Sequence, residues 1–301
     1  MEHLEFFYAD GLNKLFPEQS LVITPLPIDY IFSNFAANQE VNACAQDIKN
    51  ITWLAKFNQE VLNLHNFYQD NLEPEHVYLE DTHKLASLPE LNIFVLDLAQ
   101  EYIPQALINL LDSNLDKYLL FICHYEGRYS LSANLKFNFT PSATQKSSQF
   151  PFEITSSLNS QWLSATELLD TFNLQGKTVK DLYLNLLSLI YLNSSKHSQK
   201  QDAHTQAPQQ HAAQKHPNQA DKAPLPYDHS KVNPITLNLP KILELENQLT
   251  KLIQEGDRLN KAKNKERQPN KKFALHTNFQ KVQKKILATK EQLKQLKDAA
   301  N

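Results

Sequence analysis

The segment Leu91–Phe137, LNIFVLDLAQEYIPQALINLLDSNLDKYLLFICHYEGRYSLSANLKF, carries the strongest structural pattern in the chain. Its first apolar run, Leu91–Leu98, is typical of a strand that is covered on both faces. Pro104 suits the first turn of a helix, and the apolar residues after it recur at helical spacing. Tyr118–Tyr125 is a second apolar run. We therefore expect a strand, a helix and a second strand in this order.

A hairpin is expected after the second strand, because Glu126-Gly127 is a turn signal. From Tyr129 to Leu135 apolar and polar residues alternate, which predicts a strand with one face exposed to solvent. Ile51–Phe57 and Val61–Leu64 are further candidate strands earlier in the chain. Together these segments predict an α+β domain over residues 1–193, with a mixed sheet flanked by helices.

Two helices are predicted to complete this domain, each with a start signal. Ser164 with Glu167 forms a capping-box pattern, and Gly176 stands where a helix C-terminal cap is expected. Thr178 with Asp181 marks the start of the next helix. That helix is apolar over most of its surface, so we expect it to be buried against the sheet.

Residues 194–233 differ in composition from the rest of the chain. They are rich in Gln, His, Ala, Lys and Pro and contain few large aliphatic residues, so the sequence predicts a disordered linker. Five histidines fall in it, but their spacing does not bring ligands together as an HxxxH pattern does, so no metal site is expected. These residues are His197, His204, His211, His216 and His229.

The end of the chain, residues 234–301, is predicted to be a basic antiparallel helical hairpin. Two helical patterns are separated by a break at Pro269, and a short polar connection favours helices that fold back on each other. In each pattern apolar residues step by three and four, as in a coiled coil, with one interruption, at Gly256 and at Thr289. The seam consists of Ile242, Leu245, Leu249, Leu252, Gly256 and Leu259, then Phe279, Val282, Ile286, Thr289, Leu293 and Leu296.

Charge is divided unevenly along the chain. Pro240–Asn301 contains 15 Lys and Arg against 7 Asp and Glu, a net charge of +8, whereas the rest contains 15 against 26, a net charge of −11. This asymmetry points to a polyanion or an acidic protein as a partner, or to association of the hairpin with the acidic body. The candidate nucleic-acid-binding or partner-binding residues crowd the connection of the hairpin: Lys261, Lys263, Lys265, Arg267, Lys271 and Lys272.

Other features of the sequence favour a cytoplasmic protein without a cofactor. Cys44 and Cys123 lie far apart and form no CxxC, so we expect buried, reduced thiols. The first residues lack the basic region of a signal peptide. The longest apolar run, near Leu182–Leu192, is too short to span a bilayer. With only 4 glycines in the chain, a Gly-rich phosphate loop is not expected.

A metal-dependent nuclease is the main catalytic alternative. Such a site needs an acidic residue on one strand and an acidic-x-Lys pattern on the next, to hold a metal and orient water. Asp97 lies on a suitable strand, but Lys136 has no acidic residue two positions before it, and Glu126 is in a turn. We therefore interpret Asp97 as a polar residue at a strand end.

Other catalytic patterns are weaker still. No GxSxG occurs, and the neighbours Cys123 and His124 are expected to point to opposite faces of a strand. His124 is interpreted as a histidine with satisfied hydrogen bonds rather than as a base. Trp53 and Trp162 are interpreted as core aromatics rather than as stacking platforms for bases.

The order of elements resembles a known family. The chain contains, in order, Ile51–Phe57, Val61–Leu64, Ile93–Leu98 with its helix, Leu119–Tyr125, Tyr129–Lys136, Asp181–Leu187 and the basic hairpin with Lys271-Lys272-Phe273 and Asn278. This order resembles the bacterial domain-of-unknown-function family numbered forty-three ninety-one. The resemblance implies proteins encoded beside DNA methyltransferases and superfamily-two helicases in restriction or phage-defence loci. No chemistry is assigned to them, so no catalytic residue is carried over.

Together with the residues, this resemblance implies a non-catalytic accessory or adaptor subunit of a bacterial restriction or antiphage system. It would bind a helicase or methyltransferase subunit, and DNA through the basic hairpin. Two alternatives stay open at this point. One is a metal-dependent nuclease of the same kind of system. The other is a structural module that self-associates, for example as a homodimer through the hairpin.

Overall fold

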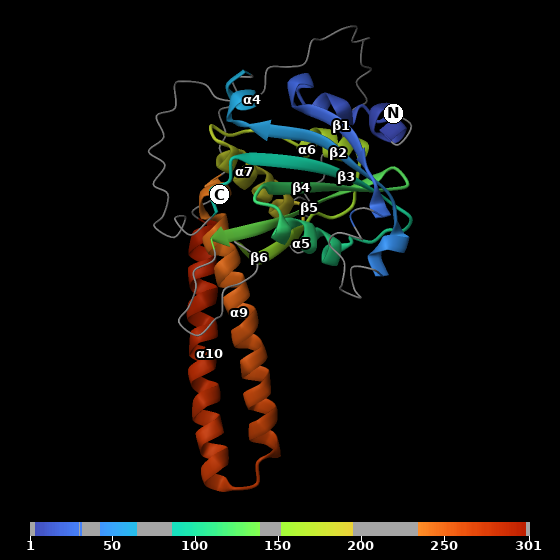
Figure 1. The fold of residues 1–301 in the computed structure, drawn as a ribbon. Coiled ribbons are helices and arrows are strands. Elements are labelled where there is room, and N and C mark those ends of the chain that lie inside the picture. Colours follow the sequence, from blue (N-terminus) through green and yellow to red (C-terminus); the bar gives the residue numbers. More distant parts are fainter. Residues whose placement is uncertain are drawn as a thin grey trace, which may run out of the picture. The chain divides into compact units, whose positions relative to one another are not determined.

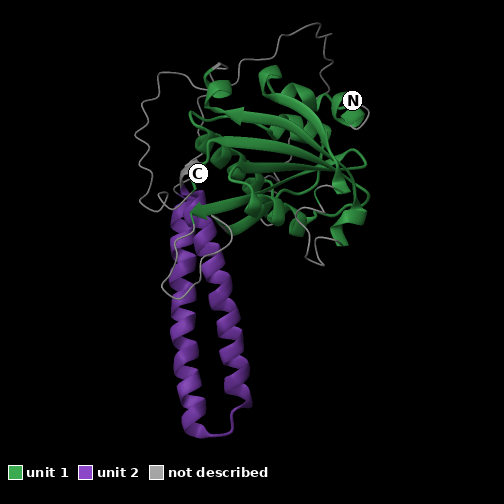
Figure 2. Cartoon of the chain, in the orientation of Figure 1, with its two compact units in different colours: residues 1–74, 86–232 green, residues 75–85, 233–301 purple. Residues whose placement is uncertain are grey.

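The structure is a computed structural model, which describes residues 4–29, 31, 43–64, 86–138, 152–194 and 234–298. The chain forms two compact units, shown in different colours in Figure 2. Unit 1 is Met1–Pro74 with Ala86–Val232, and unit 2 is Glu75–Leu85 with Asn233–Asn301. The predicted linker lies outside the described residues apart from Ser194. Each unit is described by itself.

A mixed sheet forms the centre of unit 1 (Figure 1). Its strands follow the order β1-β2-β3-β4-β5-β6, and β7 pairs with β5. The pair β3 and β4 is parallel, and every other pair is antiparallel. This confirms the α+β class expected from the sequence. The strands are β1 Leu21–Leu26, β2 Ile48–Asn58, β3 Glu90–Leu98, β4 Tyr118–Tyr125, β5 Arg128–Asn138, β6 Phe152–Asn159 and β7 Leu163–Ser164.

Helices of unit 1 lie on both faces of the sheet (Figure 1). The crossover between the parallel strands β3 and β4 contains α5, as the apolar pattern after Pro104 predicts. The α-helices are α1 Glu5–Ala9, α4 Gln59–Leu64, α5 Gln105–Asn114, α6 Ala165–Thr171 and α7 Val179–Leu192, and the short 3-10 segments are Leu12–Leu15, Glu18–Ser20 and Ala45–Asp47.

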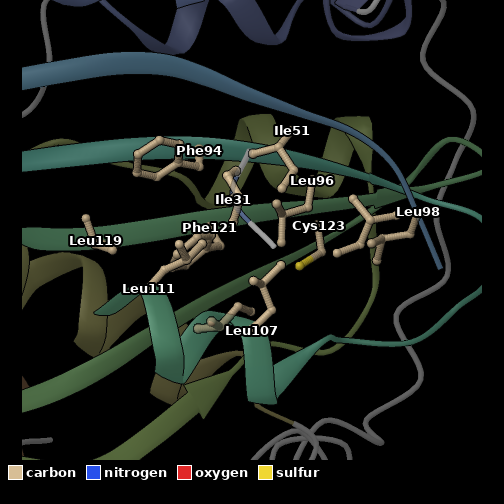
Figure 3. Packing of buried hydrophobic residues seen from close by; sticks show 12 residues of the cluster. Ile31, Ile51, Phe94, Leu96, Leu98, Leu107, Leu111, Leu119, Phe121 and Cys123 are labelled. Carbon is tan, nitrogen blue, oxygen red and sulfur yellow. The ribbon is translucent and has the colours of Figure 1, made fainter. Parts of the chain in front are cut away.

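The apolar run of β3 is buried on both sides, as expected for a covered strand. On one face Phe94 and Leu96 pack with Leu107 of α5 in an apolar cluster (Figure 3). On the other face lies the apolar helix α7, where Tyr183 stacks on Tyr118 of β4 with ring centroids 4.3 Å apart. The side chains of α7 are buried along most of its length, which confirms the prediction from its composition.

The hairpin of β4 and β5 is confirmed, but the prediction that β5 is half exposed is wrong. Residues Tyr129 to Lys136 are all buried, including the polar positions Ser132 and Asn134. The reason is that α5 packs over the polar face of β5, so that Lys136 meets Asp112 of this helix. Alternation of polar and apolar residues separates the two faces of a strand. It does not reveal that a helix covers the polar one.

The segment Val61–Leu64, predicted as a strand, lies in α4. The Asn58 side chain explains this difference, because its Oδ1 accepts a hydrogen bond from the Val61 N–H at 2.9 Å. A side-chain oxygen that accepts from a backbone N–H three residues later favours the start of a helix. The end of β2 therefore passes directly into a helical turn.

Both predicted capping boxes are present. Ser164 and Glu167 exchange hydrogen bonds at the start of α6, and Thr178 and Asp181 do so at the start of α7. The interpretation of Gly176 as a helix cap is wrong, because α6 ends at Thr171. Glycine is needed at position 176 for another reason. A Cβ atom there would lie 2.3 Å from the backbone nitrogen of Leu182.

Unit 2 contains the predicted antiparallel hairpin, formed by α9 Pro234–Lys265 and α10 Pro269–Asp298 (Figure 1). Residues early in α9 meet residues late in α10. Lys297 donates to Glu246 at 2.8 Å, and Gly256 faces Val282 and Ile286. Each predicted seam residue is buried or half-buried, and the middle of the seam packs as one cluster around Leu259, Val282 and Ile286, which confirms the expected packing face.

Replacing Gly256 by alanine is expected to stabilise the hairpin by about 0.5–1 kcal/mol, because glycine is the poorer residue in a helix interior. The added Cβ would meet its nearest neighbours at 3.6–3.7 Å, which is ordinary van der Waals distance. Thermal and urea unfolding followed by circular dichroism would measure the gain. Gly256→Leu serves as a size control, and we expect it to destabilise the hairpin because its side chain would displace Val282 and Ile286.

Candidate functional site

The six predicted binding residues gather where α9 and α10 are connected. We call them the basic tip: Lys261, Lys263, Lys265, Arg267, Lys271 and Lys272. The structure places three of them in the last turns of α9, one in the connection and two in the first turn of α10. All are exposed except Lys263, which is half-buried. Its Nζ lies 5.0 Å from the centroid of the Phe279 ring.

The connection itself is held in a defined turn. The Gln268 N–H donates to Glu266 Oε1 at 2.8 Å, and this backbone hydrogen bond is the main cause that lowers the pKa of Glu266. The Lys272 N–H donates to the Gln268 carbonyl at 2.9 Å. Glu266 is the single acidic residue between Arg258 and Lys290. Its one negative charge does not balance the six positive charges around it.

A second polar cluster lies at the carboxyl end of the parallel strands β3 and β4. Asp97 and His124 are register partners, and His124 Nδ1 lies 3.0 Å from Asp97 Oδ1. The Gly127 N–H donates to His124 Nε2 at 3.1 Å, so this nitrogen acts as an acceptor. In the neutral imidazole the proton therefore sits on Nδ1 and is donated to Asp97.

The N-terminal segment covers this cluster. The Phe6 ring stacks on the His124 ring with centroids 3.7 Å apart, and the Tyr129 hydroxyl donates to Asp10 Oδ2 at 2.5 Å. Burial, and then Asp10, raise the pKa of Tyr129 well above its ordinary value. Both ring nitrogens and one face of His124 are thus occupied by the protein. This arrangement stabilises the turn and offers no free base to a substrate.

The residues weighed for a nuclease do not come together. Asp97 is paired with His124, and Glu126 lies in the turn of the β4–β5 hairpin with a φ of 46°. Lys136 points to the opposite side of the sheet, toward α5. Within the described ranges no three His, Cys, Asp or Glu side chains form a group that could hold a metal ion. The histidines of the predicted linker lie outside these ranges.

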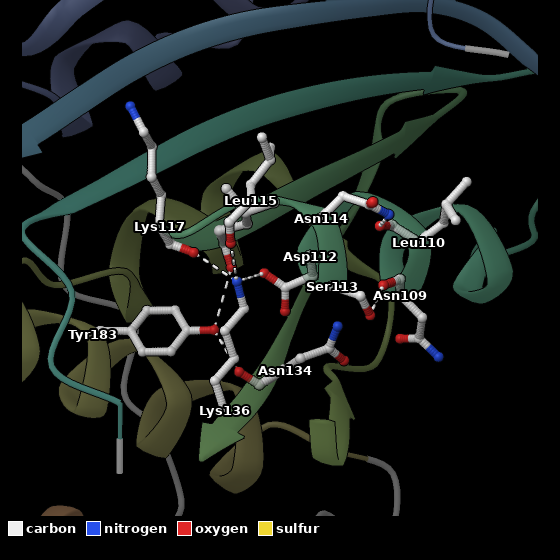
Figure 4. Close-up of polar contacts among 11 residues, drawn as sticks. Asn109, Leu110, Asp112, Ser113, Asn114, Leu115, Lys117, Asn134, Lys136 and Tyr183 are labelled. Carbon is white, nitrogen blue, oxygen red and sulfur yellow. Dashed lines mark hydrogen bonds and ion pairs between the residues drawn. The ribbon is translucent and has the colours of Figure 1, made fainter. Parts of the chain in front are cut away.

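A third polar group is an ion pair inside unit 1, between α5 and β5 (Figure 4). Lys136 Nζ lies 2.7 Å from Asp112 Oδ1, and the two side chains are 0% and 1% exposed. The same ammonium donates to the carbonyls of Leu115 at 3.0 Å and Lys117 at 2.6 Å. All three of its N–H donors thus have partners, which is the condition for placing a charge in a core.

Burial disfavours the charged forms of both Asp112 and Lys136. It raises the pKa of Asp112 from 3.8 to about 6, although Lys136 acts in the other direction. Burial also lowers the pKa of Lys136, and Asp112 opposes that shift. Tyr183 packs beside the pair and donates its hydroxyl to the Asn134 carbonyl at 2.6 Å. We interpret this group as structural, because solvent does not reach it.

The buried carboxyl should make stability depend on pH. Because the pKa of Asp112 is about 6 in the folded protein and 3.8 in the unfolded chain, folding takes up a proton between these values. The stabilisation by the protonated form is complete below about pH 4 and is lost as the pH rises through about 6. Asp112→Asn lacks this titration. We expect its stability relative to the original protein to increase from pH 4 to 6.5, measured by urea unfolding; a constant difference contradicts the assignment.

Sequence reasoning did not predict the pairing in either of the last two polar groups. Asp112 follows Ile108 by four residues, and this spacing places it on the buried face of α5. The pairing of Asp97 with His124 depends on the register of two parallel strands, which the sequence does not state. For Cys44 and Cys123 the prediction is confirmed, since both are buried and neither forms a disulfide. Burial raises the pKa of the Cys123 thiol to about 12.

None of the described helices combines the length and the apolar composition needed to cross a membrane. The two tryptophans, interpreted from the sequence as core aromatics, are partly buried against the cluster around α5. Trp53 donates its Nε1–H to the Ala55 carbonyl at 3.2 Å. Neither tryptophan is therefore an exposed ring on which a base could stack.

The fold is thus that of an α+β protein with a mixed sheet and a separate helical hairpin. The sequence model of a family described as "Domain of unknown function (DUF4391)" matches residues 15–231, and the chain belongs to this family. The match ends before α9 begins, so the hairpin lies outside it although the sequence resemblance included it. Searches among curated proteins and among solved structures found no match.

Proposed function

We propose that the protein is a non-catalytic accessory subunit of a bacterial restriction or antiviral system and that the basic tip binds DNA. The observation that carries the DNA contact is the gathering of six cationic side chains at one end of the hairpin. Five of them are exposed, and Glu266 is the single acidic residue among them. A helicase or methyltransferase subunit of the same system is the proposed protein partner, on the ground of the family resemblance.

Phosphate binding is the chemistry that this surface supports best. Lys and Arg side chains neutralise phosphates and release condensed counterions, which gives binding that weakens as salt rises. Contacts from lysine and arginine to phosphates position a protein on DNA without reading the base sequence. Binding is therefore expected to be independent of DNA sequence. Such a contact would position the complex on DNA, while a partner subunit would supply chemistry.

The test uses the full chain and a fluorescent DNA duplex, with binding followed by anisotropy across salt concentrations. A variant with Lys265→Ala, Arg267→Ala, Lys271→Ala and Lys272→Ala should bind at least about tenfold more weakly. The slope of log affinity against log salt should fall by about one for each lost contact. The physical reason is that each removed cation leaves one more phosphate unneutralised, so that binding releases one fewer counterion from the DNA.

The matched control removes four exposed lysines elsewhere on α10: Lys284, Lys285, Lys290 and Lys294. It lowers the net charge equally but leaves the basic tip intact, so its salt slope should stay near that of the original protein. Equal loss in both variants would mean that net charge alone attracts DNA. Binding that does not respond to salt would contradict phosphate contacts.

The protein partner needs a separate experiment. We expect purification of the tagged full chain from its native host to recover helicase or methyltransferase subunits, identified by mass spectrometry. Mass measurement in solution, with and without Pro240–Asn301, distinguishes this from self-association through the hairpin. A homodimer that disappears on deletion, together with no recovered partner, would favour the structural alternative.

A further inference from the structure

The basic tip contains one exposed aromatic ring. Phe273 follows Lys271 and Lys272 in the first turn of α10, and its relative exposure is 73%. Among the described residues it is the most exposed aromatic side chain, since Tyr102 follows at 45%. A phenylalanine in this position contributes little to the stability of the hairpin, because most of its apolar surface stays in water.

The helical geometry explains why Phe273 points outward. The seam of α10 begins with Leu275 and Phe279, which pack against α9. Phe273 lies two residues before Leu275, and this spacing places Phe273 off the seam. The other aromatic near the tip, Phe279, is half-buried and has Lys263 over its ring. In the described part of the chain no ring or cation is seated on Phe273, so its faces are available to a ligand.

The surroundings of Phe273 restrict the kind of ligand. Its nearest charged neighbours along the chain are Arg267, Lys271 and Lys272, all exposed, so the ligand should be anionic. A membrane surface is a poorer match, because a helix that lies on a membrane presents a continuous apolar face. The next exposed large hydrophobic residue on α10 is Leu287, fourteen residues or about 21 Å further along the axis.

We propose that Phe273 is a stacking platform for an unpaired base, so that the basic tip binds single-stranded nucleic acid in preference to duplex. This proposal rests on the proposed function, since it takes phosphate contacts by the same tip as given. An aromatic ring beside cations is the combination that single-strand-binding proteins use, with the ring on a base and the cations on the backbone.

The stacking of bases within a duplex explains the preference for a single strand. In a duplex each base is already stacked on its neighbours, and a side chain must unstack a step before it can insert. In a single strand the base is free to stack on Phe273. Stacking on an aromatic side chain is independent of base identity to a first approximation, since every base has a π face. Junctions, tails or displaced strands would therefore be the natural targets.

The test compares two probes of equal length, a single-stranded oligonucleotide and a blunt duplex, with the full chain at fixed salt. Phe273→Ala is expected to weaken single-strand binding at least about fivefold, which corresponds to the lower end of the measured stacking contributions. Duplex binding and both salt slopes should not change, because no cation is removed. Phe273→Trp should retain single-strand binding, and its fluorescence should be quenched on binding.

Leu287→Ala is the matched control, since Leu287 is 74% exposed on the same helix and lies away from the basic tip. It should leave both affinities unchanged. The proposal is overturned if Phe273→Ala leaves single-strand binding unchanged, or weakens both probes equally; the proposed DNA contact then still stands. If the original protein binds neither probe in a salt-dependent way, the proposed function itself has failed. Binding to vesicles of anionic lipid that requires Phe273, without single-strand binding, also overturns the proposal.

Discussion

Lys136→Met is expected to lower the free energy of unfolding of unit 1 by about 3–5 kcal/mol, the range found when one partner of a buried ion pair is removed. The substitution leaves Asp112 in the core without its cation. It also leaves the carbonyls of Leu115 and Lys117 without the donor that they share. Urea unfolding followed by circular dichroism would measure the change.

Two controls distinguish the loss of stability caused by breaking the ion pair from a general effect of losing a lysine. Lys117→Met removes a half-exposed lysine that pairs with Glu90 at 2.6 Å, and we expect a loss of at most about 1 kcal/mol. The double variant Lys136→Met with Asp112→Leu should recover much of the lost stability, because no buried charge is left. If the single variant is as stable as the Lys117 control, Lys136 is not held in the core as the structure shows.

The second large effect is expected for Gly176→Ala, with a loss of about 3 kcal/mol, at the upper end of the range for overpacked sites. The new Cβ would lie 2.3 Å from the Leu182 nitrogen and 2.7 Å from its Cα. These are backbone atoms in the first turn of α7, so relief requires the helix to move. Since α7 packs against the sheet, the shift would disturb the core of unit 1.

The same substitution at Gly256 is the control for Gly176→Ala, because the two effects should have opposite signs. Alanine fits at Gly256 and is the better helix residue, whereas at Gly176 it meets backbone. Separate unfolding transitions of the two units, followed by hydrogen exchange, would assign each effect to its unit. An unchanged stability of Gly176→Ala would show that the segment before α7 can move away from it.

Local patterns in the sequence predicted much of the fold. Thr178 and Asp181 form their capping box from side chains three residues apart, which is independent of the rest of the fold. The strand at Leu91–Leu98 is apolar on both faces, which is typical of a strand covered on both sides of a sheet. The seam of the hairpin repeats over two long helices, so a single interruption at Gly256 or Thr289 does not change which face packs.

The candidate sites also differ in how far the sequence could predict them. The basic tip could be predicted because its cations lie close together along the chain, on both sides of one connection. Phe273 was visible in the sequence, but its exposure depends on its place relative to the seam. The cluster of Asp97 and His124 joins two strands that are 27 positions apart, and only their parallel register brings them into contact.

The sequence by itself determined the local elements, the division into an acidic body and a basic hairpin, and the place of the cationic residues. Only the tertiary structure decided which polar residues are buried. Ser132, Asn134 and Lys136 have the pattern of an exposed face, yet α5 covers them. The physical reason is that burial depends on what packs over a surface, and the partner of Lys136 comes from a distant part of the chain.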